Sequence, residues 1–240
     1  LILASAYLYA YLFAKPMLSM GPSALVLLIA SVLTVLLCLL MGEYLNINAM
    51  PVALGAMLVV NLLGARPAYV TNMALTLIIT LLTAKGTGLV TSQTMSVLLT
   101  CSLGGLVAIW MMRKNTTRVM VVVSGLVVGA VNFGVLVCVR ALTSSDMSGV
   151  WTDMAYAIGG AVVSAVLCVG LQPILETAFN LVTPSKLIEL SNPNQPLLRR
   201  LMIETPGTYH HSMVVANLAE AAAEAVGANA LLVRVGAYYH

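Results

Sequence analysis

The residues best suited to metal chemistry are three histidines near the end of the printed sequence: His210, His211 and His240. A neutral imidazole nitrogen is the commonest side-chain ligand for metals, and it binds several divalent transition ions. His210 and His211 are neighbours, so on a helix their side chains point about 100° apart. Residue type and spacing alone favour core or surface histidines over ligands, and both alternatives stay open at this level.

Other chemically capable side chains give weaker signals, and no catalytic residue is assigned. Glu176 is the acid that comes nearest to the interior of an apolar run, and it is interpreted as an interfacial acid beside Pro173. The four cysteines lie in apolar runs without the paired spacing of metal sites, which predicts buried thiols: Cys38, Cys101, Cys138 and Cys168.

Two helices are expected to position the histidines. After Pro206 and Gly207, apolar residues recur at helical spacing and predict an amphipathic helix of soluble type. Gly227 to Asn229 would end it, and Ala230 to His240 would form a second helix packed against it. The predicted apolar stripe, which would turn His211 into the domain interior, is His211, Val214, Val215, Leu218, Ala222 and Ala225.

The rest of the chain has the composition of a membrane protein. Hydrophobic residues make up 60% and charged residues 8% of the 240 residues, and the mean hydropathy is +1.00. A soluble surface needs far more charge, about a quarter of all residues. The net charge of +3 comes from dispersed single residues without a basic patch, so nucleic acid is not expected as a partner and the lipid bilayer is.

We predict an all-α fold with about seven transmembrane segments, since a crossing needs about 20 apolar residues. The third and fourth runs are short, and they form either two crossings or a re-entrant hairpin. The predicted domains are a membrane domain over 1–179, a cytoplasmic connector over 180–206 and the start of a soluble helical domain over 207–240. The apolar runs are Leu1–Ala14, Pro22–Met41, Met50–Gly64, Tyr69–Thr83, Leu89–Met112, Val119–Ala141 and Met154–Phe179.

Charged residues between the runs predict the orientation. Basic residues without acids, which mark the cytoplasmic side, occur in one set of alternating loops; the other set mixes both signs. This places the start of the chain at the outer face and everything after Phe179 in the cytoplasm. The basic set is Lys15, Arg66, Arg113, Lys114 and Arg118, and the mixed set is Glu43, Lys85, Arg140, Asp146 and Asp153.

Polar residues inside the predicted crossings are mostly uncharged, with Asn61, Asn72, Gln93 and Asn132 the most notable. The scarcity of ionisable groups argues against an ion pathway. Gly125 and Gly129 have the spacing of close helix contacts, which serve either a homodimer or packing within one bundle.

The end of the chain resembles the start of the HD phosphohydrolase domain of 7TM-HD proteins, which are bacterial membrane receptors. The resemblance rests on ETPGTYHHSMVVANLAEAAAEAVGAN, from Glu204 to Asn229, and on Val235 to His240; Leu190 to Leu201 is similar to the segment that joins membrane and HD domain in that family. The predicted seven crossings agree with the family's architecture.

The resemblance implies a function. Family HD domains use a pair of divalent metal ions, manganese or iron, to hydrolyse cyclic di-AMP to pApA. An extracellular sensory domain would precede the crossings, and the protein would lie in the bacterial inner membrane. Carried over from the family, His211 and His240 are metal ligands. The family's aspartate after His240 is not in the sequence, so we expect a fragment that is inactive by itself and binds the metal pair incompletely.

Two further readings remain open on the residues alone. One is a transporter or channel with a cytoplasmic regulatory tail, which the composition permits. The other is a noncatalytic, membrane-anchored assembly module. No cleavable signal peptide is expected, because Leu1 to Ala14 lacks a basic start and a small-residue cleavage site.

Overall fold

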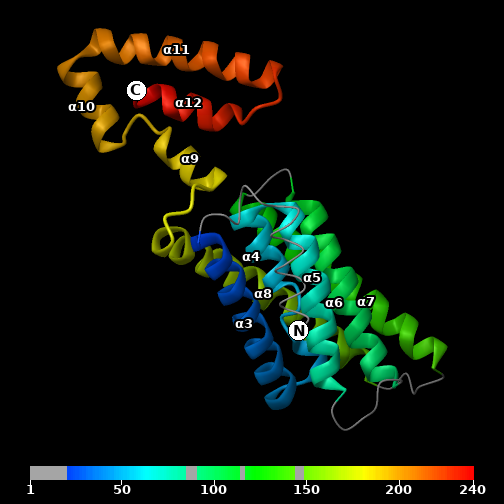
Figure 1. Cartoon of the computed structure of the whole chain (residues 1–240). Coiled ribbons are helices and arrows are strands. Elements are labelled where there is room, and N and C mark those ends of the chain that lie inside the picture. Colours follow the sequence, from blue (N-terminus) through cyan, green and yellow to red (C-terminus); the bar gives the residue numbers. More distant parts are fainter. Residues whose placement is uncertain (1–20, 85–90, 114–116, 144–148) are drawn as a thin grey trace. The chain divides into compact units, whose positions relative to one another are not determined.

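The structure is a computed structural model that describes residues 21–84, 91–113, 117–143 and 149–240. Within these ranges the regular elements are all helices (Figure 1), which confirms the predicted all-α class. The chain divides into two compact units, with the boundary between Leu181 and Val182. The elements are α3 (Gly21–Tyr44), η1 (Ile47–Ala49), α4 (Leu54–Leu63), α5 (Ala65–Thr83), α6 (Ser92–Met112), α7 (Arg118–Leu142), α8 (Val150–Ala178), α9 (Pro184–Leu190), α10 (Pro196–Glu204), α11 (Pro206–Ala225) and α12 (Ala230–Tyr238).

Five helices among the described residues are long and apolar enough to cross a membrane: α3, α5, α6, α7 and α8. Their outer faces carry large exposed apolar side chains such as Leu28, Leu36 and Val166, as expected of helices that face lipid. Helices α3, α6, α7 and α8 coincide with four of the predicted crossings to within a few residues. The first predicted crossing, Leu1–Ala14, lies outside the described residues.

The fourth predicted crossing is longer in the structure than in the prediction. Helix α5 begins at Ala65 and has 19 residues. Arg66 and Pro67, which appeared to end an apolar run, form its first turn. Proline is tolerated there because the backbone N–H groups of the first turn have no acceptor within the helix, so the N–H group that proline lacks is not needed.

The third predicted crossing contains an interrupted helix. Helix α4 has 10 residues, all of them buried, and a helix of this length covers about 15 Å of a hydrocarbon core about 30 Å thick. The single 3-10 turn η1 precedes it, and the backbone between Met50 and Ala53 belongs to neither helix. Backbone groups outside a helix are tolerated at membrane depth only where protein surrounds them.

The interrupted segment lies along α8. At one end, a Cβ atom added to Gly160 would lie 2.6 Å from the carbonyl oxygen of Ala49, so the two backbones touch. Farther along, the Asn61 side-chain amide donates to Gln172 Oε1 at 3.0 Å, and Gln172 in turn donates to Glu176 at 2.8 Å. These contacts fasten the segment to α8 at both ends.

Helices α7 and α8 pack closely through small residues. An added Cβ on Gly125 would lie 2.6 Å from the Ala165 side chain, and one on Gly129 would lie 3.1 Å from the Ile158 Cα atom. The glycine spacing therefore serves packing within the bundle, which was one of its two predicted uses.

The second unit, Val182–His240, contains α9 to α12. Its first two helices occupy the predicted connector, and each begins with proline at the first helical turn. The Thr183 hydroxyl accepts from the Lys186 backbone N–H at 3.2 Å and caps α9. The side chain of Leu198 in α10 is buried together with Ala216 and Tyr238, so this connector is part of the soluble unit.

The close contact at Gly160 leads to a stability prediction. Gly160→Ala should destabilise the bundle by about 1 to 3 kcal/mol, because the new methyl group meets backbone that has no room to move. Gly159→Ala is the matched control, since nothing lies within 4 Å of its added Cβ, and it should be neutral or slightly stabilising. Thermal unfolding of both variants in detergent tests this; equal midpoints would contradict the packing.

Candidate metal centre

The histidines are carried by a helical hairpin within the second unit. Helices α11 and α12 run side by side in opposite directions (Figure 1). Gly227, with φ of +69°, follows α11 in the left-handed conformation that ends many helices. The Asn229 side chain then accepts from the Leu232 backbone N–H at 3.1 Å and caps α12.

The predicted apolar stripe of α11 is wrong in phase. The buried residues of α11 are Ser212, Ala216 and Ala223, whereas Leu218 is 68% exposed and His211 is exposed. Small side chains let α12 approach closely, so they occupy the contact although they are less hydrophobic than Leu218. His211 therefore lies at the surface of the hairpin and does not point into the interior.

The position of α12 is determined by polar contacts around a small core. Arg234 forms an ion pair with Glu220 of α11, with Nη1 and Oε2 3.0 Å apart, and donates from Nε to the Tyr238 hydroxyl at 2.6 Å. The hydrogen bond to Tyr238 raises the pKa of Arg234. The Tyr239 hydroxyl donates to the backbone carbonyl of Leu190 at 2.9 Å, and burial raises the pKa of Tyr239. These contacts hold the two residues that precede His240.

The structure brings His211 and His240 together. Their ring centroids are 6.3 Å apart, and the ring planes are inclined by 48°. His240 Nδ1 lies 2.8 Å from the Ala237 carbonyl oxygen. A carbonyl can only accept, so Nδ1 is the donor in this contact, which leaves Nε2 as the ring nitrogen that faces other partners.

These two imidazoles fit part of a metal site. In the described part of the chain, no group of three or more His, Cys, Asp or Glu side chains is placed to hold a metal ion. A transition ion held by protein commonly takes three or four protein ligands, so the two imidazoles are fewer side chains than such an ion commonly needs. His210 is exposed on the same helix and has no described contact with the pair.

Sequence reasoning missed one polar feature of the membrane unit. Arg140 and Asp153 were assigned to loops, but they lie in the last turn of α7 and the first turn of α8. They form an ion pair in which the side chains are only 26% and 11% exposed. A basic and an acidic residue flanking one predicted loop is the signal that would have found it.

The described residues thus define a multi-pass membrane protein with a second helical unit in which two histidine rings lie close together. A family model described as "7TM receptor with intracellular HD hydrolase" matches residues 1–183. The chain belongs to this family, as the resemblance of its histidine segment predicted.

Two curated relatives extend the comparison. The chain is 37% identical over 225 residues to the cyclic-di-AMP phosphodiesterase PgpH of Bacillus subtilis (strain 168), an alignment that covers 89% of this chain and 31% of the relative. It is 46% identical over 140 residues to the protein of the same name from Listeria monocytogenes serotype 1/2a (strain 10403S), covering 58% and 20%. The chain therefore spans a third or less of the length of these relatives. No solved structure matches it.

The hydrogen bond from Tyr239 leads to a prediction about the histidine that follows it. Tyr239→Phe should increase local opening at the end of α12, because a lost hydrogen bond costs about 0.5 to 1.5 kcal/mol. Hydrogen–deuterium exchange of the whole chain should be up to about tenfold faster there. Tyr209→Phe is the control, and equal exchange in both variants would refute the role of Tyr239.

Proposed function

We propose that this chain is the membrane part and the beginning of the HD domain of a signal-responsive, metal-dependent phosphodiesterase that hydrolyses cyclic di-AMP to pApA. The observation that carries the proposal is the pairing of His211 and His240 at 6.3 Å on the α11–α12 hairpin in a member of this family. The names of the two curated relatives support the substrate.

In this proposal, His211 and His240 are metal ligands. His240 would bind through Nε2, since its Nδ1 is engaged with the Ala237 carbonyl. The hairpin holds the two rings, and the Arg234 contacts hold α12 against α11. When bound, a pair of manganese or iron ions would polarise the phosphodiester and generate a hydroxide from bound water near neutral pH.

The orientation is also a proposal. We place the soluble unit in the cytoplasm and the start of the chain at the outer face of a bacterial inner membrane, because Arg66, Arg113 and Arg118 are at the other end of the bundle from Asp153 and Glu43. A sensory domain outside the membrane would precede the crossings, and the bundle would connect it with the hydrolase.

Hydrolysis by the full-length gene product tests the catalytic proposal. With manganese, we expect turnover of cyclic di-AMP to pApA, abolished by a chelator and restored by added metal. His211→Ala should lower kcat/KM by more than about hundredfold because a ligand is lost. His210→Ala, the adjacent exposed histidine, should stay within about threefold. No turnover, or equal effects of the two variants, would refute the assignment.

Metal binding by the 240-residue chain itself is a separate prediction. Two imidazoles alone hold manganese weakly, since this ion stands at the low end of the affinity order and prefers oxygen ligands. Equilibrium dialysis should give well below one tightly bound ion per chain, and His240→Ala should reduce it further. Tight binding of two ions would contradict the incomplete ligand set.

A further inference from the structure

A polar cavity lies in the membrane unit at the end of the bundle where α8 begins. Its volume is about 320 Å³, and it is bordered by η1, α6, α7 and α8. This volume is at the low end of the range typical of small-molecule sites, roughly 300 to 1,000 Å³. Its main polar lining residues are Asn46, Asn48, Gln93, Ser96, Arg140 and Asp153.

Among the described residues that line the cavity, one is basic and one is acidic. Asp153 is 8% exposed, and it pairs with Arg140 on the neighbouring helix. The other described lining residues are uncharged. Charged side chains in a membrane bundle are costly to bury, and they usually mark a site with a function.

The interrupted helix contributes a second observation at the same place. Asn46 and Asn48 come from the irregular backbone around η1, and the Asn46 side chain accepts from the Asn48 backbone N–H at 2.9 Å. Membrane proteins commonly use the breaks of discontinuous helices to bind polar solutes. Here the segment around η1, which precedes the interruption, and the ion pair border one cavity.

Buried polar groups continue beyond the cavity. A smaller space of about 10 Å³ shares Ile47, Asn48 and Leu136 with it and reaches Asn132, which is room for one water molecule. Asn132 is 5% exposed, and its Oδ1 atom has no hydrogen-bond partner among the described residues. The smaller space therefore adds an unpaired amide oxygen to a lining that is otherwise mostly apolar.

We propose that this cavity binds a small zwitterionic solute of the α-amino-acid type. Its carboxylate would pair with Arg140, whose guanidinium matches a carboxylate in geometry, and its ammonium group would pair with Asp153. Such a solute would give the Arg140 guanidinium and the Asp153 carboxylate a group of opposite charge each. A ligand with a single charge would separate this ion pair and supply an opposite charge to only one of its two members, which is costly for a buried pair.

The position of the cavity gives the solute access to a defined side of the membrane. Asp153 is in the first turn of α8 and Glu176 is in its last turn, about 35 Å away at 1.5 Å per residue. The chain continues from the Glu176 end toward the hydrolase, which the family description places inside the cell. In the proposed orientation the cavity faces the outside, and the proposal concerns binding only, independently of the phosphodiesterase activity.

The test is a binding measurement on the 240-residue chain in phosphatidylcholine nanodiscs. Calorimetry measures the binding of five probes: glycine, L-alanine, L-serine, L-leucine and L-glutamine. At least one should bind with a dissociation constant below about 1 mM. Its N-acetyl derivative, which keeps only the carboxylate, and its amide, which keeps only the ammonium group, should each bind at least about tenfold more weakly.

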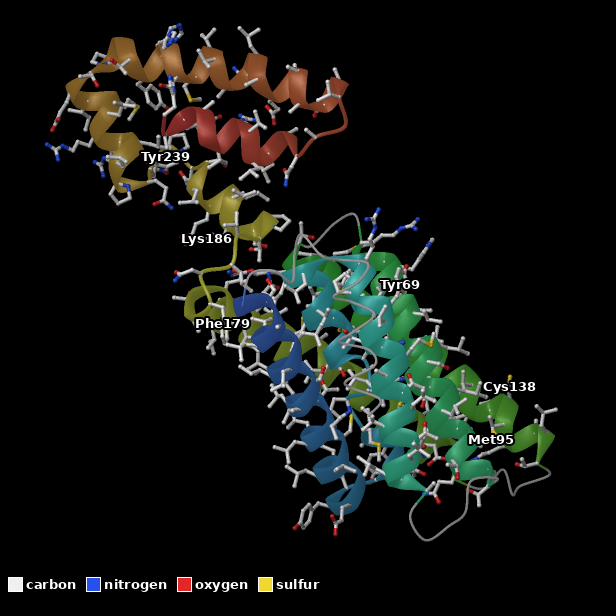
Figure 2. All side chains as sticks on the ribbon, viewed as in Figure 1. Tyr69, Met95, Cys138, Phe179, Lys186 and Tyr239 are labelled. Atoms are coloured by element: carbon white, nitrogen blue, oxygen red, sulfur yellow. The ribbon has the colours of Figure 1, made fainter. Side chains whose placement is uncertain are left out.

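Two variants of α6 separate the site from the fold. Gln93 lines the cavity and is exposed, so Gln93→Trp adds bulk to the cavity wall without removing either charge, and it should weaken binding at least about tenfold. Met95→Trp is the control. Met95 is 41% exposed on the same helix (Figure 2), and it does not line the cavity. The affinity of this variant for the solute should stay within about twofold of that of the unaltered chain.

A third variant tests the charge assignment. Asp153→Asn should remove most of the preference for the amino acid over its N-acetyl derivative, since the partner of the ammonium group is gone. Failure of all five probes to bind, equal binding of the singly charged derivatives, or no effect of Gln93→Trp would each overturn the proposal.

Discussion

The membrane unit depends on the burial of backbone that is not helical. A peptide group without a partner costs several kcal/mol in hydrocarbon, so the irregular backbone around η1 and before α4 can exist only where protein or a water-filled cavity surrounds it. Helix α4 accordingly has no exposed residue, and the longer helices α3, α5, α6 and α8 pack around it. The polar side chains Asn61 and Gln172 add a directed hydrogen bond, which determines the register of the segment along α8.

Close helix approach in both units comes from small residues. In the membrane unit, Gly125, Gly129 and Gly160 lie where a methyl group would meet a neighbouring side chain or backbone. In the soluble unit, Ser212, Ala216 and Ala223 form the buried face of α11. Larger apolar residues are displaced outward in both, toward lipid in the bundle and to the surface of the hairpin. Size at the contact therefore decides the packing more than hydrophobicity does.

The two units carry different chemistry. The helical hairpin holds two imidazoles with ring centroids 6.3 Å apart, and His240 Nδ1 lies beside the Ala237 carbonyl oxygen. The membrane unit holds an ion pair and several amides around a cavity at the end where α8 begins. Helix α8 is the last element of the membrane unit before the chain enters the second unit.

The sequence by itself determined the class of the protein, because long apolar runs without charge can be stable only as membrane helices. It also identified the family and its histidines, since the residues around His211 and His240 are specific over a long stretch. The helix in the connector could have been predicted from the sequence, because Thr183 and Pro184 are ordinary helix-start residues. The interruption before α4, the outward direction of His211 and the pairing of Arg140 with Asp153 were decided only by tertiary structure. Each depends on which helix lies beside which, and contacts between residues far apart in the chain leave no local periodic pattern to read.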